Sequence, residues 1–197
     1  VHLVLPVDEL ESAGIGDNPT DRCYKCKKFL FTRMLQKAEE LGVRRILEGT
    51  NEDDLHVYRP GIRALKELGI KSPLADAGMT KADVRRLAAE YGMPVAAKPA
   101  APCLATRFPY GTKLTYEKLE AVGKGEDFLK TLGFRNVRLR VHDTIARIEV
   151  DVEEFPLVSE HRKEIINVLS GLGYPYVTLD LAGFRSGSMD IGLDADR

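Results

Sequence analysis

The sequence predicts an α/β domain followed by a smaller α+β domain. In the first half, short apolar runs at residues 1–7 and 43–48 alternate with segments of helical periodicity, which is typical of an α/β layer. In the second half, a helical segment precedes two stretches that alternate at period two, another amphipathic helix and a last strand. We place the boundary so that the first domain comprises residues 1–112 and the second residues 113–197.

Capping and terminating residues mark the helices of the first half. Residues 18–21, Asn-Pro-Thr-Asp, predict a helix start, and Gly42 predicts its end. A second helix opens at residues 59–61, Arg-Pro-Gly, and a third follows Thr80, which forms a capping-box pattern with Asp83. These helices alternate with the two short runs expected as strands.

Alternation defines the strands of the second half. Residues 137–141 place Arg138 and Arg140 on one face of a strand, and residues 146–150 alternate in the same way. A helix is expected at residues 158–172 and a last strand at residues 176–181. The order is therefore helix, strand, strand, helix, strand.

Composition limits the classes of function. The chain has 197 residues, and its net charge of -1 gives no global attraction to nucleic acid or anionic lipid. No apolar run approaches the ~20 residues that span a bilayer, so we expect no membrane partner. Residues 1–6 read as a strand rather than as an export signal, and three cysteines are an odd number. We therefore expect a reducing, cytoplasmic location.

Three thiols form the candidate chemical site. Cys23 and Cys26 fall near the first turn of the first helix, where positions i and i+3 share a face. Cys103 lies four residues before Arg107 in a proline-containing loop. We predict that the three thiols meet and that Arg107 holds an anionic substrate beside them. Three alternatives remain open: a redox site, a zinc site, and isolated buried thiols. A closed zinc site requires a fourth ligand, and no histidine lies in these motifs.

Five motifs, in one order, resemble the LarE-type sulfur transferases, which are similar to PP-loop ATP pyrophosphatases. The match extends over nearly all of the chain, and several ordered motifs are far more specific than one. They read Asn-Pro-Thr-Asp-Arg-Cys-Tyr-Lys-Cys-Lys at 18–27, Glu-Gly-Thr-Asn at 48–51, Arg-Pro-Gly at 59–61, Cys-Leu-Ala-Thr-Arg-Phe-Pro-Tyr-Gly at 103–111 and Gly-Phe-Arg-Ser-Gly at 183–187.

This resemblance implies an activity in the synthesis of the nickel-pincer cofactor of lactate racemase. The family uses ATP and Mg²⁺ to adenylate a carboxylate of pyridinium-3,5-biscarboxylic acid mononucleotide and then installs sulfur as a thiocarboxylate. Members with three cysteines in this arrangement hold a 4Fe–4S cluster, which implies Cys23, Cys26 and Cys103 as its ligands and as catalytic residues. The expected partners are the mononucleotide, a sulfide or other sulfur donor, and further copies of the chain in a homo-oligomer, a hexamer in the family.

The resemblance also assigns binding residues. It implies that a set of mostly cationic side chains holds the substrate phosphate. For Arg138 and Arg140, which share a strand, the alternative is that they form only a solvated face of that strand. Glu48 and Asn51 are candidate ligands of Mg-ATP, against the alternative of an acidic surface turn. The predicted substrate-binding residues are Arg107, Thr106, Arg138, Arg140 and Arg185.

One family motif is not found in the sequence, the phosphate loop Ser-Gly-Gly-x-Asp-Ser that follows the first strand. We therefore expect a partial PP-loop domain, which by itself is unstable or self-associates and does not cleave ATP to AMP. Two rival functions stay open. One is a cluster-dependent tRNA-thiolating PP-loop enzyme, against which the lack of any Lys/Arg-rich run counts. The other is a zinc-binding module without catalysis.

Overall fold

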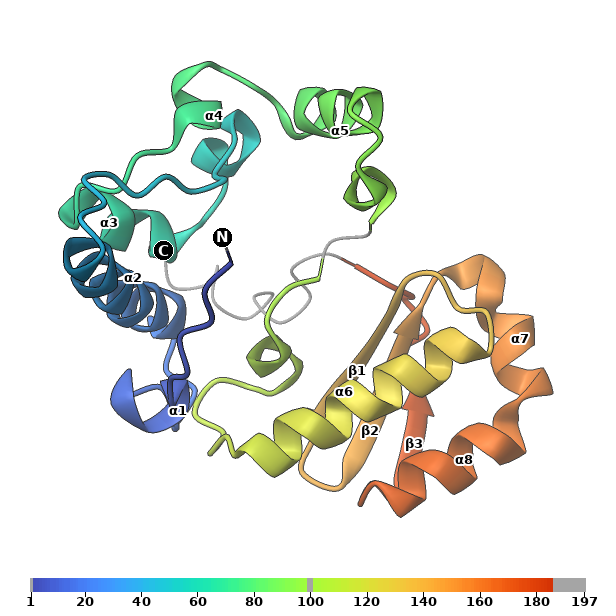
Figure 1. Cartoon of the computed structure of the whole chain (residues 1–197). Coiled ribbons are helices and arrows are strands. Elements are labelled where there is room, and N and C mark those ends of the chain that lie inside the picture. The colour runs from blue at the N-terminus through green and yellow to red at the C-terminus, as the bar shows by residue number, and fades with distance from the viewer. Residues whose placement is uncertain (1, 99–100, 186–197) are drawn as a thin grey trace. The chain divides into compact units, whose positions relative to one another are not determined.

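The computed structural model describes residues 2–98 and 101–185 (Figure 1). The chain divides into two compact units, Val1–Ala100 and Ala101–Arg197. Residues 101–112, which the sequence analysis places at the end of the first domain, belong to the second unit here. The ion pair between Arg107 and Glu126 of that unit, with 2.7 Å between Nε and Oε1, shows why this stretch packs there. Val1 and the last motif's Ser186 and Gly187 lie outside the described residues.

The described part of the first unit consists of helices and loops. The predicted helix starts are confirmed: Asp21 precedes the longest helix, Pro60 is the first residue of the next long one, and Thr80 and Asp83 form a reciprocal capping box. The elements are α1 (Glu9–Ser12), α2 (Arg22–Glu40), the 3-10 helix η1 (Glu52–His56), α3 (Pro60–Glu67), α4 (Pro73–Asp76), α5 (Lys81–Glu90) and the 3-10 helix η2 (Pro94–Ala97).

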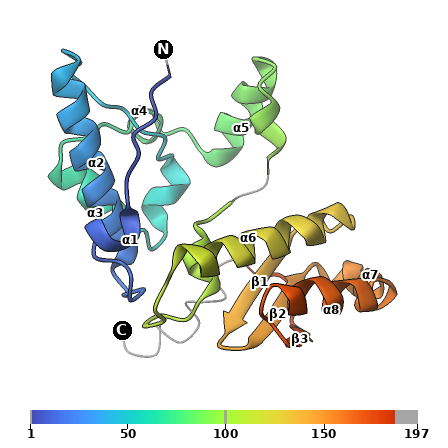
Figure 2. The ribbon, with the colours of Figure 1, turned by 60° about the horizontal axis from the view of Figure 1, so that its bottom comes forward.

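Helices α2 and α3 lie side by side in this unit (Figure 2). Gly61 lets α3 approach closely, because a Cβ atom there would lie 2.9 Å from Cδ of Lys27 and 3.4 Å from the carbonyl oxygen of Cys23. The Arg63 guanidinium lies over the Tyr24 ring, 3.7 Å from its centroid, and the Tyr24 hydroxyl donates to Glu67 at 2.7 Å. These contacts hold the cysteine-bearing turn of α2 against α3.

The parallel sheet expected in the first unit is reduced to one bridge among residues 2–98. Residues 2–7 form no strand, and within residues 43–48 only Leu47 pairs, in parallel, with Lys71. The Glu48 amide donates to the Lys71 carbonyl at 2.9 Å, and the Lys71 amide donates to the Ile46 carbonyl at 3.3 Å. Apolar runs become strands only where a neighbour pairs their backbone groups. The structure thus shows a mixed α/β chain without confirming a PP-loop sheet.

The second unit has the predicted order of strands and helices. Its sheet runs β1-β2-β3, with β1 and β2 antiparallel and β2 and β3 parallel. The helix expected at residues 158–172 is two helices, α7 and α8, that meet at His161. The elements are η3 (Leu104–Arg107), α6 (Tyr116–Thr131), β1 (Val137–His142), β2 (Ile145–Val150), η4 (Val152–Glu154), α7 (Phe155–Glu160), α8 (Arg162–Gly171) and β3 (Tyr176–Leu179).

The two faces of this sheet differ in chemistry. One face is apolar and packs against α6 and α8, which lie along it in Figure 1. Its core residues Val137, Leu139, Val141, Ala146, Ile148 and Val150 are all buried. A Cβ atom at Gly125 of α6 would lie 2.7 Å from Cδ2 of Leu139 and 3.1 Å from Cδ2 of Leu169, so helix and sheet approach closely there. The other face carries the charged residues.

Within residues 2–98 and 101–185, no helix is both long enough and apolar enough to cross a membrane.

Candidate functional site

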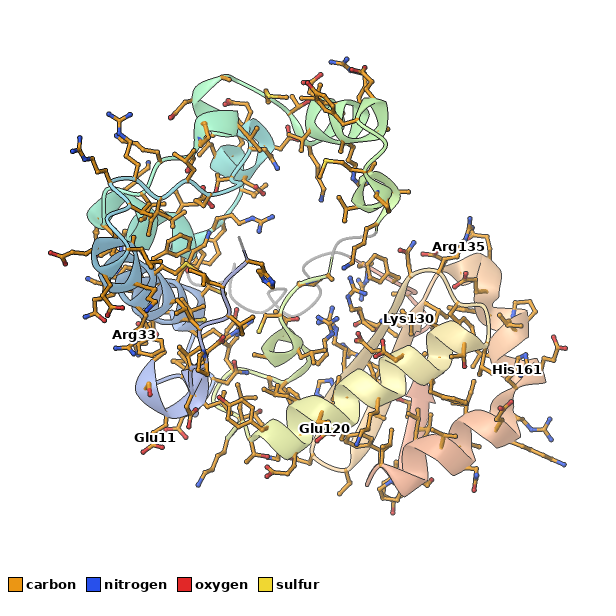
Figure 3. All side chains as sticks on the ribbon, viewed as in Figure 1. Glu11, Arg33, Glu120, Lys130, Arg135 and His161 are labelled. Atoms are coloured by element: carbon orange, nitrogen blue, oxygen red, sulfur yellow. The ribbon has the colours of Figure 1, made fainter. Side chains whose placement is uncertain are left out.

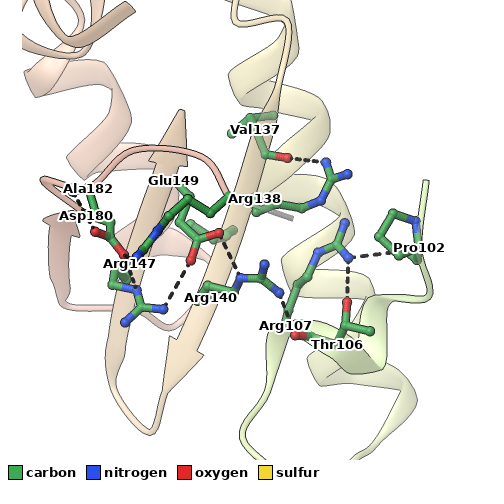
Figure 4. Close-up of polar contacts among 12 residues, drawn as sticks. Pro102, Thr106, Arg107, Val137, Arg138, Arg140, Arg147, Glu149, Asp180 and Ala182 are labelled. Atoms are coloured by element: carbon green, nitrogen blue, oxygen red, sulfur yellow. Dashed lines mark hydrogen bonds and ion pairs between the residues drawn. The ribbon is translucent and has the colours of Figure 1, made fainter. Parts of the chain in front are cut away.

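The charged face of the sheet, here called the polar face, is formed by alternate residues of β1 and β2. In the antiparallel register, Arg138 of β1 lies opposite Glu149 of β2, and Arg140 lies opposite Arg147. Figure 4 shows these side chains grouped with Arg107 and Thr106. Period-two alternation thus gathers the Arg-x-Arg strand and a second arginine-bearing strand on one face.

Glu149 joins two of these arginines. Its side chain is 0% exposed, and its two oxygens accept from Nε of Arg140 and from a terminal nitrogen of Arg147, each at 3.1 Å. Arg140 is also buried, and one of its terminal nitrogens, Nη1, donates to the Thr106 carbonyl at 2.7 Å. Burial lowers the pKa of Arg140, although the Glu149 carboxylate acts in the opposite direction. The prediction that Arg138 and Arg140 lie on one face of a strand is confirmed, and Arg140 is buried there rather than solvated.

Arg107 is held by a bidentate ion pair. Its Nε and one terminal nitrogen donate to the two carboxylate oxygens of Glu126 at 2.7 and 2.9 Å, and both side chains are buried. Its other nitrogen donates to the Thr106 hydroxyl at 2.7 Å. Glu126 also accepts the backbone N–H of Leu139 at 2.9 Å. One carboxylate therefore fastens η3 to the strand that carries Arg138 and Arg140.

Arg138 is placed by the chain that follows β3. Its guanidinium lies 5.1 Å from the centroid of the Phe184 ring and donates to the Val137 carbonyl at 2.7 Å. Gly183 precedes this ring with a φ of +71°, and a Cβ atom there would lie 2.8 Å from Cγ2 of Val152, so a side chain does not fit. Burial, together with the nearby Arg107 cation, lowers the pKa of Arg138. The Gly-Phe-Arg motif thus supports the polar face.

Positive charge is in excess on this face. Asp180, just past β3, lies 3.5 Å from Nε of Arg147 and 3.8 Å from a terminal nitrogen of Arg185. Among the described residues, Arg107 and Glu126 neutralise each other, and four further guanidinium groups lie on this side of the sheet with the carboxylates of Glu149 and Asp180. Guanidinium groups thus outnumber carboxylates in this part of the described chain, in a partly buried environment where screening by water is weak. Such a cluster is suited to a doubly charged anion.

The three thiols are divided between the units. Cys23 is exposed, and Cys26, half-buried on the same turn of α2, donates to Glu9 with 3.5 Å between Sγ and Oε2. Cys103 is exposed at the start of η3, where its carbonyl accepts from the Thr106 hydroxyl at 2.8 Å and from Arg107 at 3.4 Å. In the described part of the chain, no group of three or more His, Cys, Asp or Glu side chains forms a metal site. The shared three-thiol site stays a prediction.

Glu48 and Asn51 have structural partners in the first unit. Glu48 accepts from the amide and hydroxyl of Thr50 at 3.0 and 2.9 Å and from the Ser72 hydroxyl. Burial raises its pKa, but these hydrogen bonds and the Lys27 cation outweigh burial, so the pKa of Glu48 is lowered. Asn51 caps η1 by accepting from the Asp54 amide at 3.3 Å. Their predicted role toward Mg-ATP stays a prediction.

Sequence reasoning missed three charged residues of the polar site: Glu126, Arg147 and Glu149. The sequence nevertheless contains patterns that indicate these three residues. Residues Val122, Glu126 and Leu129 share one helical face, so a glutamate interrupts an apolar stripe. On β2, Arg147 and Glu149 alternate with apolar residues just as the two arginines of β1 do. A charge at a core position needs a partner, and the nearest candidates were the arginines already identified.

No protein-family model matches the chain. The chain is 40% identical over 96% of its length to an uncharacterised protein of Synechocystis sp., of which it covers 71%. It is 39% identical over 93% of its length to pyridinium-3,5-bisthiocarboxylic acid mononucleotide synthase of Lactiplantibacillus plantarum, of which it covers 67%. It is 32% identical over 86% of its length to an uncharacterised protein of Methanocaldococcus jannaschii, of which it covers 66%.

The Glu126 ion pair gives a test of the site's construction. Replacing Glu126 with Ala leaves the buried Arg107 charge and the Leu139 amide without their acceptor, so we expect a loss of about 3–5 kcal/mol of unfolding free energy. Glu120→Ala is the matched control, because Glu120 lies on the same helix, is exposed and pairs with Lys124 (Figure 3). We expect this control to lose less than about 1 kcal/mol. Urea unfolding measures both, and equal losses would contradict the buried pair.

Proposed function

The chain belongs to the family of pyridinium-3,5-bisthiocarboxylic acid mononucleotide synthase, the LarE-type sulfur transferases, and we propose on that premise that it installs sulfur on a carboxylate of a pyridinium mononucleotide. The product is a thiocarboxylate used in nickel-pincer cofactor synthesis. The substrate is pyridinium-3,5-biscarboxylic acid mononucleotide, which carries a phosphate monoester at one end and the reacting carboxylates at the other.

The observation that carries this proposal is the excess of positive charge on the polar face. A phosphate monoester bears close to two negative charges at neutral pH, which suits a face on which guanidinium groups outnumber carboxylates among the described residues. Arginine binds phosphate oxygens in a planar, bidentate manner. The substrate-binding set is Arg138, Arg140 and Arg185, with Arg107 and Thr106 holding the loop and the Arg140 side chain in place.

Cys103 brings a thiol to the same unit as these arginines. The Cys103 carbonyl oxygen accepts a hydrogen bond from Arg107. Arg107 in turn pairs with Glu126, which also accepts the Leu139 amide of β1. The loop that presents the thiol is thus fixed to the strand that binds the phosphate. Holding the phosphate end restricts where the carboxylate lies, which lowers the entropic part of the barrier.

The reaction needs a leaving group and a sulfur source. ATP with Mg²⁺ would convert a carboxylate oxygen to an acyl adenylate, and sulfur then forms a bond to the acyl carbon while the bond to AMP breaks. The donor set, three thiols with no histidine in their motifs, fits an iron–sulfur group better than a closed zinc site. When bound, a 4Fe–4S cluster held by Cys23, Cys26 and Cys103 would supply the sulfur.

Metal and sulfide content tests the sulfur end of the proposal. After anaerobic purification of the protein, we expect bound iron and acid-labile sulfide in near equal amounts. Cys103→Ala should remove both, because two thiolates do not retain the cluster. Full iron retention in that variant would exclude the three-thiol site, and one zinc per chain without iron would instead support a zinc-binding module.

Binding of the mononucleotide tests the phosphate end. Arg140→Ala removes a charge-assisted contact, so we expect about ten- to a hundredfold weaker binding. Because Arg140 is buried and also pairs with Glu149, Arg138→Ala, at a half-buried side chain, provides a milder second variant. Titration calorimetry with the mononucleotide measures both. Wild-type affinity in both variants would assign the phosphate to another part of the protein.

A further inference from the structure

Two arginines face each other directly across the β1–β2 pair. Arg140 and Arg147 are partners in the register of the antiparallel strands. Like charges in directly opposed positions destabilise a sheet, and burial adds to the cost because the charges lose water. Departures from such local rules concentrate at functional sites. The pair therefore calls for a reason beyond folding.

Glu149 holds the two guanidinium groups in a fixed arrangement. One of its oxygens accepts from Arg140 and the other from Arg147, each at 3.1 Å, and the carboxylate is completely buried. Arg147 differs from Arg140 in its accessibility: its side chain is 30% exposed, against 5% for Arg140. Glu149 thus anchors one buried arginine and one that solvent reaches.

Arg147 keeps donor capacity for a ligand. Its buried Nε makes no hydrogen bond to the part of the chain that the structure describes and lies 3.5 Å from a carboxylate oxygen of Asp180. The Glu149 contact uses one terminal nitrogen. Arg147 therefore lies beside Arg140 with its position fixed from one side, as a bidentate phosphate contact requires.

We propose that Arg147 is a further phosphate-binding residue and that Glu149 is the positioning residue that holds Arg140 and Arg147 as a clamp. This inference rests on the proposed function, which places the substrate phosphate on the polar face. The clamp selects phosphate monoesters over carboxylates, because a phosphate monoester offers the two guanidinium groups three acceptor oxygens and close to two negative charges, whereas a carboxylate offers two oxygens and one charge. Arg147 belongs to none of the motifs that carry the family resemblance.

The first test replaces Arg147 with Gln and measures binding of nicotinate mononucleotide, a pyridinium mononucleotide, by titration calorimetry. We expect at least about tenfold weaker binding than in the wild type. Nicotinate riboside, which lacks the phosphate, should bind both proteins equally. Arg135→Gln is the matched control, because Arg135 lies at the surface of the same unit and its side chain is 85% exposed (Figure 3). We expect this variant to bind the mononucleotide as tightly as the wild type does. Unchanged binding in Arg147→Gln would overturn the proposal.

The second test separates positioning from charge. Glu149→Gln adds one net positive charge to the face, so a site that acts by charge alone would bind the mononucleotide more tightly. A Gln amide accepts through one oxygen only and presents its N–H groups to the other arginine. We therefore expect at least about tenfold weaker binding despite the added charge, and tighter binding would overturn the positioning role. Should this buried substitution prevent folding, Arg147→Gln at its partly exposed side chain decides the proposal.

These outcomes are distinguishable from failure of the proposed function. A wild-type protein that binds nicotinate mononucleotide through Arg147 but forms no thiocarboxylate when it is given the acyl adenylate of the substrate supports the clamp and removes the sulfur-transfer proposal. A wild-type protein that binds no phosphate monoester overturns both.

Discussion

The bidentate ion pair between Arg107 and Glu126 is the interaction on which the candidate site depends. It is buried, and the same carboxylate accepts the Leu139 amide of β1. Through it, a loop that carries a thiol is fixed to a strand that carries two arginines. Without that carboxylate, Arg107 would be an uncompensated buried charge, and the loop would lose the side chain that joins it to α6 and β1.

The polar face and the adjoining ion pair between Arg107 and Glu126 reduce the stability of the fold, because they bury charged side chains. Arg107, Arg140, Glu126 and Glu149 are all buried, and apolar residues of similar volume would often stabilise such positions at least as well. The apolar face of the same sheet supplies the packing that offsets this cost, because α6 and α8 bury it along β1 and β2. The two faces of the sheet thus differ in role: the apolar face stabilises the unit, and the polar face holds charged side chains in a defined geometry.

Periodicity allowed the second unit to be predicted, because each strand alternates and pairs with its neighbours there. The first unit was predicted only in its helices. Residues 43–48 have a strand-like composition, but pairing depends on a partner that composition does not specify, and one parallel bridge to Lys71 is what forms. Alternation within residues 137–141 identified Arg138 and Arg140. Glu149 was missed because its importance lies in the two arginines that it joins, one of them on the neighbouring strand.

The central claim is that the polar face binds the substrate phosphate, and the arginine side chains themselves report this most directly. Their Nε–H groups are observable by NMR in protein with ¹⁵N-labelled arginine. On titration with nicotinate mononucleotide, the signals of Arg138, Arg140 and Arg147 should shift together and saturate, while that of Arg135 stays in place. Equal shifts at Arg135, or no saturable shift on the polar face, would contradict the account.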